Sequence, residues 1–326
     1  MLLNLPTELK ELILSFLTRK EYKQSVPCKD LLLCKSYFSL EEFSKLKVLP
    51  KVRLDTCPQT SSDTGCTLTE LENLFLKSCE NNNLWLADKL ITKSNVDPSV
   101  NDNFAISCSS HNGHLEIVER LLEDSRVDPS ANDNDAIIRA SAEGHLEIIN
   151  RLLKDSRVDP SAQNNQVIRY ASREGYLEVV ERLLEDPRVD PSIDKNYPIC
   201  YASYYGHLEI VERLLRDSRV NPSDNKNFTI CSAAERGYTK IVKILLLDPR
   251  VNPSDMNNYA ILWSSNHGHL EIVERLLKDP RVNPSAQNNQ AIRWALKNGH
   301  LEVIERLLKD TRFNPLDNNS TIINAS

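Results

Sequence analysis

The chain has 326 residues, a net charge of −6 at pH 7, and 26% charged against 40% hydrophobic residues, which is ordinary for a soluble folded protein. The negative charge argues against a general nucleic-acid binder, and no apolar run approaches the roughly 18 residues of a membrane span. The apolar start lacks a basic leader, so we expect no signal peptide. The eight cysteines form no CxxC pair and no spacing typical of a secreted disulfide scaffold, so reduced thiols in an intracellular protein, cytoplasmic or nuclear, are expected.

The segment NLPTELKELILSFL near the start of the chain predicts an amphipathic helix. Its apolar residues fall on one stripe at helical spacing, namely Leu5, Leu9, Leu12, Ile13, Phe16 and Leu17. Two further apolar segments, DLLLCKSYF and LEEFSKL, indicate that residues 1–50 form a module of two or three short helices. So few residues bury little core, and such a module is marginal without a partner.

This module resembles an F-box, a family that docks on the Skp adaptor subunit of cullin-RING ubiquitin ligases. The resemblance rests on the Leu-Pro before the amphipathic helix and on the later run VPCK. It implies that the adaptor-binding residues are Leu5, Pro6, Leu9, Ile13 and Leu17. Val26, Cys28 and Lys29 resemble the central valine-cysteine-lysine run of the family, but Pro27 interrupts it and no Trp follows before Trp85. The alternative is a helical cap or docking module unrelated to ubiquitin.

Residues 51–66 contain Pro, Ser, Thr and Asp and are predicted to be a linker. Beyond the linker the chain repeats itself every 31 residues. Seven of the eight glycines keep this period without exception: Gly113, Gly144, Gly175, Gly206, Gly237, Gly268 and Gly299. The prolines from Pro98 to Pro315 keep the same period. Such regularity identifies a tandem array.

One unit, AQNNQAIRWALKNGHLEVIERLLKDTRFNPL at residues 286–316, predicts two helices and a loop. Asn289 is placed to cap the first helix, and Gly299 ends it because glycine enters the left-handed region cheaply. Ile292, Ala295 and Leu296 form a stripe that we expect to be buried. The second helix, HLEVIERLL, leads into an Asn-Pro loop that favours a type I turn. A unit of this size cannot bury its apolar faces alone, which predicts a solenoid of stacked helix pairs.

Seven such units are predicted over residues 100–316. Residues 67–99 keep the phase but carry Asn82 in place of glycine, so we expect a divergent unit that caps the N-terminal end. Residues 317–326 begin another unit and stop inside its first helix, where Ile323 continues the isoleucine column. This incomplete terminal unit is expected to cover the last core face. The predicted fold class is therefore all-α, a helix-turn-helix solenoid preceded by the small helical module.

The recurring AxxGHLEIVERLL followed by an Asp/Asn loop resembles the ankyrin repeat. The resemblance implies an ankyrin-type solenoid that binds a partner protein. The period of 31 differs from the usual period of about 33. The Asp-Gly of the usual hairpin tip and the Thr-Pro that opens the first helix are absent. The short units with VDPS loops also resemble arrays encoded by large DNA viruses of amoebae, for which the location would be the host cell.

No catalytic triad, glycine-rich phosphate loop or HExxH occurs, so we expect no enzyme and no catalytic, cofactor or metal site. A histidine follows the repeat glycine at His114, His145, His207, His269 and His300. Stacked helices lie about 8–10 Å apart, whereas zinc ligands lie about 2 Å from one ion. The ankyrin resemblance instead gives these histidines a structural role between adjacent backbones.

Glutamates recur along the second helices and predict a solvated face. The fifth repeat inverts this charge with Arg236, Lys240 and Lys243. We expect ion pairs with Glu209 and Glu271 of the neighbouring repeats, and the alternative is a docking site.

Four of the ten tyrosines fall on one side of one predicted helix, about 140–240° from the core residue Ile199 on the helical wheel. In the ankyrin resemblance this side lines the concave surface, where partners bind. The same phases in other repeats carry aromatic or arginine side chains. The candidate target-binding residues are Arg139, Tyr170, Tyr197, Tyr201, Tyr204, Tyr205, Phe228, Tyr259, Trp263 and Trp294. Whether Trp263 and Trp294 are exposed or packed between repeats stays open.

The resulting hypothesis is a monomeric interaction protein, a substrate-recruiting adaptor of an SCF-type ubiquitin ligase. Residues 1–50 would engage the Skp subunit, and the array would hold an unknown target protein. The rival is an ankyrin scaffold or inhibitor that sequesters a protein without any ubiquitin role. Neither reading involves nucleic acid, a membrane or a cofactor.

Overall fold

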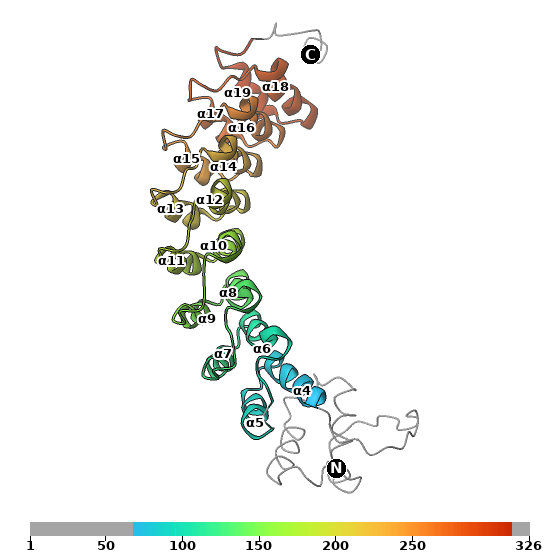
Figure 1. Cartoon of the computed structure of the whole chain (residues 1–326). Coiled ribbons are helices and arrows are strands. Elements are labelled where there is room, and N and C mark those ends of the chain that lie inside the picture. Colours follow the sequence, from blue (N-terminus) through green and yellow to red (C-terminus); the bar gives the residue numbers. More distant parts are fainter. Residues whose placement is uncertain (1–67, 95, 315–326) are drawn as a thin grey trace, which may run out of the picture. The chain divides into compact units, whose positions relative to one another are not determined.

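The computed structural model describes residues 68–94 and 96–314, and these ranges contain helices and no strand (Figure 1). The predicted all-α fold class is confirmed for them. The F-box-like module, the linker and residues 317–326 lie outside the described residues, so the predictions for Leu5, Pro6, Leu9, Ile13 and Leu17 remain predictions. No helix of the described part combines the length and the apolar character that crossing a membrane requires.

The chain divides into two compact units, the first ending at Val100 and the second starting at Asn101. In the first unit, α4 (Leu68–Glu80) and α5 (Leu84–Ser94) contact each other. Asn82 stands where the later repeats have glycine and has a left-handed φ of 54°.

In the second unit, a first and a second helix alternate along the chain. The first helices are α6 (Val100–His111), α8 (Ala131–Glu143), α10 (Ala162–Glu174), α12 (Ile193–Tyr205), α14 (Asp224–Arg236), α16 (Asp255–Asn266) and α18 (Ala286–Asn298). The second helices are α7 (Leu115–Leu122), α9 (Leu146–Leu152), α11 (Leu177–Leu184), α13 (Leu208–Leu215), α15 (Thr239–Leu245), α17 (Leu270–Leu276) and α19 (Leu301–Leu308). First helices from α8 to α18 contact first helices, and second helices contact second helices, which gives the two columns of Figure 1.

The core consists of apolar columns that run through the stack. The isoleucine column of the first helices is at most 2% exposed: Ile106, Ile137, Ile168, Ile199, Ile230, Ile261 and Ile292. Burying one such side chain stabilises the fold by about 1.5–3 kcal/mol. The alanine column, including Ala202 and Ala233, is fully buried and lets successive first helices approach closely.

One predicted core position is wrong. Leu296 is 38% exposed, although its equivalents Ser203, Ala234 and Ser265 are fully buried. Leu296 lies on α18, the last first helix of the described chain, so no further described helix covers it.

The predicted helix cap at Asn289 is also wrong. The first turn of each first helix contains three consecutive left-handed residues, such as Gln287, Asn288 and Asn289 with φ of 52°, 57° and 61°. This turn places the Asn side chain beside the loop at the end of its own repeat, and the amide of Asn289 donates to the carbonyl of Asn314 at 2.8 Å. In the earlier repeats the Asn carbonyl accepts a backbone N–H of that loop, as Asn134 does from Asp159 at 2.7 Å.

The repeat glycines end the first helices in the predicted left-handed conformation, as Gly206 does with φ of 87°. Two features of Gly206 exclude a side chain at this position: its left-handed backbone conformation and the close approach of the next repeat. A Cβ on Gly206 would lie 2.6 Å from the ring of Tyr238 in the next repeat. The glycine column therefore allows the close approach of successive repeats as well as the turn.

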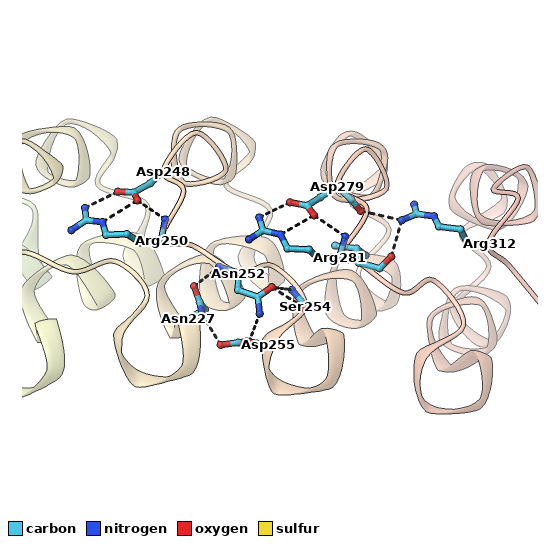
Figure 2. Close-up of polar contacts among 10 residues, drawn as sticks. Asn227, Asp248, Arg250, Asn252, Ser254, Asp255, Asp279, Arg281 and Arg312 are labelled. Carbon is cyan, nitrogen blue, oxygen red and sulfur yellow. Dashed lines mark hydrogen bonds and ion pairs between the residues drawn. The ribbon is translucent and has the colours of Figure 1, made fainter.

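The loops after the second helices form a ladder of arginine–aspartate pairs (Figure 2). Arg219 donates from Nε and Nη2 to Asp217 at 3.0 and 2.7 Å, and from Nη1 to the carbonyl of Val189 in the preceding repeat at 2.8 Å. The same three bonds recur at Arg157, Arg188 and Arg250. Each such arginine thus ties its own loop to the one before it.

We predict that Arg219→Ala lowers the free energy of unfolding by about 1–3 kcal/mol, because it leaves the shielded Asp217 carboxylate and the Val189 carbonyl without these partners. Urea unfolding measures the loss. The control is Arg216→Ala just after the same second helix, since the Arg216 side chain is exposed and makes no hydrogen bond or ion pair in the described part. Equal stabilities of the two variants would contradict the ladder's role.

The ladder also predicts a pH dependence. The side-chain hydrogen bond from Arg219 lowers the pKa of Asp217, and equivalent bonds lower the pKa of Asp186 and Asp248. A carboxyl whose folded pKa is depressed stabilises the fold fully above its unfolded value of about 3.9 and loses that contribution as pH falls toward the folded value.

We therefore expect the urea midpoint to fall as pH drops below about 4, and to fall less steeply in the triple variant Asp186→Asn/Asp217→Asn/Asp248→Asn. The exposed glutamates offer a control, Glu119→Gln/Glu178→Gln/Glu181→Gln. The same acid dependence in the aspartate variant and the native chain would refute the assignment.

Candidate protein-binding surface

The candidate target-binding residues all lie on the first helices, and none is fully buried. Tyr205 is 46% exposed and Arg139 is also exposed. The remaining eight are half-buried: Tyr170, Tyr197, Tyr201, Tyr204, Phe228, Tyr259, Trp263 and Trp294. We call these ten residues the first-helix surface.

The four tyrosines of α12 contact one another and form the tyrosine cluster. Tyr197 and Tyr201 stack with ring centroids 3.8 Å apart, and Tyr204 and Tyr205 meet edge to face at 5.0 Å. The centroid of Tyr201 lies 6.3 Å from each of the last two rings. Burial raises the pKa of Tyr197, with a further contribution from Tyr201, so this phenol stays neutral at physiological pH.

Arginines from the flanking repeats cover this cluster. The guanidinium of Arg169 on α10 lies 4.5 Å from the ring centroid of Tyr197. The guanidinium of Arg236 on α14 lies 4.2 Å from that of Tyr204 and donates a hydrogen bond to its hydroxyl. Cation–π contacts of this kind hold an aromatic side chain in one orientation. The cluster is thus ordered by contacts that cross two repeat boundaries.

The sequence pattern did not single out these arginines as part of the site. A signal was present, because Arg236 follows Tyr204 by 32 residues and Arg169 precedes Tyr197 by 28, both close to the period of 31. Side chains about one period apart lie on adjacent helices of a stack.

A second group, the tryptophan cluster, spans α16 and α18. The ring centroids of Trp263 and Trp294 lie 5.1 Å apart across the repeat boundary, and Tyr259 lies 5.5 Å from Trp263. The hydroxyl of Tyr259 donates to Glu235 at 2.8 Å. Burial, then this hydrogen bond, raises the pKa of Tyr259. Both tryptophans therefore contact each other between repeats while part of each remains exposed.

The exposed His267 extends this cluster. Its ring centroid lies 5.6 Å from that of Trp263.

Three of the candidate residues stand apart. The ring centroid of Tyr170 lies 4.9 Å from the guanidinium of Arg173 on the same helix. Arg139 forms an ion pair with Asp135 of its own helix at 2.6 Å. Phe228 makes no ring contact with either cluster within the described residues.

Four of the five repeat histidines have the expected structural role. Nε2 of His145, His207, His269 and His300 lies 2.9–3.0 Å from a backbone carbonyl of the preceding repeat. No group of three or more His, Cys, Asp or Glu that could hold a metal occurs in the described part. Burial raises the pKa of Cys200 to about 11 and of Cys231 to about 12, so both thiols are protonated and poorly nucleophilic.

Comparison with known proteins identifies the repeat. A family model described as ankyrin repeats (3 copies) matches residues 75–164, 168–257 and 232–319, which together make up well over half of the chain. No curated protein matches the chain. The helix pairs and the histidine contacts between repeats are consistent with this family match. Ankyrin repeats serve as surfaces for binding other proteins. The chain belongs to the ankyrin-repeat family and is a protein–protein interaction module.

Proposed function

We propose that this protein is a substrate-recruiting adaptor of a cullin-RING ubiquitin ligase, in which the first-helix surface binds the target and residues 1–50 bind the Skp subunit. The observation that carries the target-binding half is the aromatic character of one side of α10, α12, α16 and α18, where the rings remain partly exposed. The adaptor half is supported by the F-box resemblance of residues 1–50, and it places the protein inside the cell, in cytoplasm or nucleus.

The composition of the first-helix surface favours a protein ligand. Tyrosine, tryptophan and arginine dominate the energetically important positions of protein interfaces, where the loss of one such side chain costs about 2 kcal/mol or more. Each ring offers a large apolar face, while the tyrosine hydroxyl and the indole N–H can hydrogen-bond.

The clusters are also ordered before any partner binds. Tyr197 and Tyr201 are stacked, and Tyr204 is fixed by Arg236. Side chains that already occupy one conformation lose less entropy on binding, so more of the contact energy appears as affinity. A preordered aromatic patch of this kind suits recognition of a folded or helical segment of a target.

We predict that Tyr204→Ala/Tyr205→Glu weakens target binding at least about tenfold, since it removes two aromatic anchors. This variant copies the residues that the second repeat carries at the same positions, Ala142 and Glu143, so the fold should be retained.

The target is first captured from cell extract with the full chain and identified, and its affinity is then measured for each variant by calorimetry. Glu116→Ala/Glu119→Ala, on the exposed side of α7, is the control. Unchanged affinity in the tyrosine variant would remove the first-helix surface from the proposal.

The adaptor role has a separate test. Purified Skp subunit should bind the intact chain, and binding should be lost in Leu5→Ala/Pro6→Ala and in a chain that lacks residues 1–50. The array provides the internal control, because target binding should persist in both variants. If the intact, folded chain does not bind the Skp subunit, the ubiquitin role is refuted and the protein acts as an ankyrin scaffold or inhibitor that sequesters its target.

A further inference from the structure

The helix α15 breaks the pattern of the second helices. Three repeats carry the same sequence LEIVERLL, at residues 115–122, 208–215 and 270–277, whereas the fifth repeat reads TKIVKILL at residues 239–246. Lys240 and Lys243 replace glutamates, and Ile244 replaces an arginine. The residue that follows, Leu247, stands where all the other repeats carry a charged side chain. The buried positions Ile241 and Val242 are kept, so the change is confined to the outer side of the helix.

Leu247 is 76% exposed, the largest value among the exposed large hydrophobic side chains of the described chain. Leu301 and Leu308 are also well exposed, at 71% and 53%, but they lie on α19, the last second helix that the structure describes. α15 instead has α13 on one side and α17 on the other. The exposure of Leu247 is therefore not an effect of the end of the stack.

Four cations occupy neighbouring positions of the repeat pattern. Lys240 and Lys243 on α15 precede Leu247 by seven and four residues, and Leu247 lies two residues beyond the end of that helix. Arg216 and Lys278 occupy the position of Leu247 in the preceding and following repeats. All four are exposed, and none makes an ion pair within the described residues. We call Arg216, Lys240, Lys243, Leu247 and Lys278 the basic–apolar patch.

The ion pairs expected between these lysines and Glu209 or Glu271 do not form. Glu271 instead pairs with Arg275 of its own helix at 3.1 Å. Residues four apart on one helix are neighbours, whereas a pair between second helices must span the distance between helix axes. The positive charge of the lysines is thus left for a ligand.

Acidic residues limit the extent of the patch. Glu212 and Glu274 occupy the position of Lys243 on α13 and α17, and Glu209 and Glu271 occupy that of Lys240. An extended anionic surface, such as a lipid bilayer or a nucleic acid, would meet these glutamates as well as the cations. A short acidic segment can contact the cations alone.

We propose that the basic–apolar patch binds an acidic segment of a partner protein that places an apolar side chain on Leu247. Carboxylates of the segment pair with the exposed cations, and burial of Leu247 removes its apolar surface from water. The patch lies on α15 and on the turns that follow α13, α15 and α17, whereas the first-helix surface lies on first helices, so the two sites use different residues. This inference does not depend on the proposed ubiquitin role.

The array itself supplies the test variants. Lys240→Glu/Lys243→Glu/Leu247→Lys writes into the fifth repeat the residues of the sixth at the same positions, Glu271, Glu274 and Lys278, so the variant should fold. The control for net charge is Lys195→Asp/Lys226→Asp, which copies Asp133 of the second repeat at two exposed positions. Circular dichroism melts check that all three chains are folded, and Leu247→Lys alone serves if the triple variant melts early.

The probe is a phage-displayed library of random dodecapeptides, selected on the full chain after depletion on the triple variant. We expect the enriched peptides to carry Asp or Glu around an apolar residue. In fluorescence anisotropy these peptides should bind the triple variant at least about tenfold more weakly, bind the control normally, and lose affinity as salt rises.

Failure to enrich acidic peptides, or equal binding to the native and triple-variant chains, would overturn the proposal. An equal loss in the lysine control would overturn it too, because net charge alone would then explain binding. Vesicles of phosphatidylcholine with phosphatidylserine form a further arm. If the native chain binds them and the triple variant does not, the patch is a membrane contact and the protein-segment proposal is wrong.

Discussion

Every repeat is held to the next by hydrogen bonds that join a side chain of one repeat to the backbone of its neighbour. Around α12 these are Arg219 to the carbonyl of Val189 and His207 to the carbonyl of Arg173. Apolar columns alone could slide along the stack, because burial has no direction. Hydrogen bonds have defined distances and angles, so they fix the register, and the contacts between Arg169, Arg236 and the tyrosine cluster depend on that register.

The loops vary between repeats, and in two of them a second change accompanies the variation. Asp159 and Asp190 are followed three positions later by an apolar residue, whereas Asn221 and Asn252 are followed by Asp224 and Asp255; Asn283 has Ala286 at that position. An amide brings two N–H donors that a carboxylate lacks. Asp255 accepts a hydrogen bond from Asn252 at 2.5 Å and another from Asn227 of the preceding repeat at 2.6 Å (Figure 2). Asp255 therefore adds a side-chain connection between its repeat and the preceding one.

The period made the solenoid, the glycine turns and the isoleucine core predictable, because each needs only a residue type at a fixed phase. The wrong predictions concern features that depend on contacts with neighbouring segments. The left-handed turns include Gln163, Lys195 and Met256, residues whose local preferences do not favour that conformation. The turn was therefore not predicted, and Asn289 was wrongly taken as a helix cap. The arginines over the tyrosines were not assigned to the site because their contacts cross repeats. Leu296 was wrongly placed in the core because a column of equivalent residues does not show which member has no covering neighbour.

In a repeat array, a substitution whose new side chain is satisfied by a second substitution differs in meaning from one whose new side chain finds no partner in the chain. The loop residues Asn221 and Asn252 are accompanied by Asp224 and Asp255, which accept hydrogen bonds from the new amide groups. The changes on α15 have no such match, since Lys240 and Lys243 gain no carboxylate and Leu247 gains no apolar cover. An exposed leucine among unpaired cations contributes little to folding. Its presence in one repeat out of seven is best explained by contacts that lie outside this chain, and those contacts differ in chemistry from what the aromatic rings of α12 would recognise.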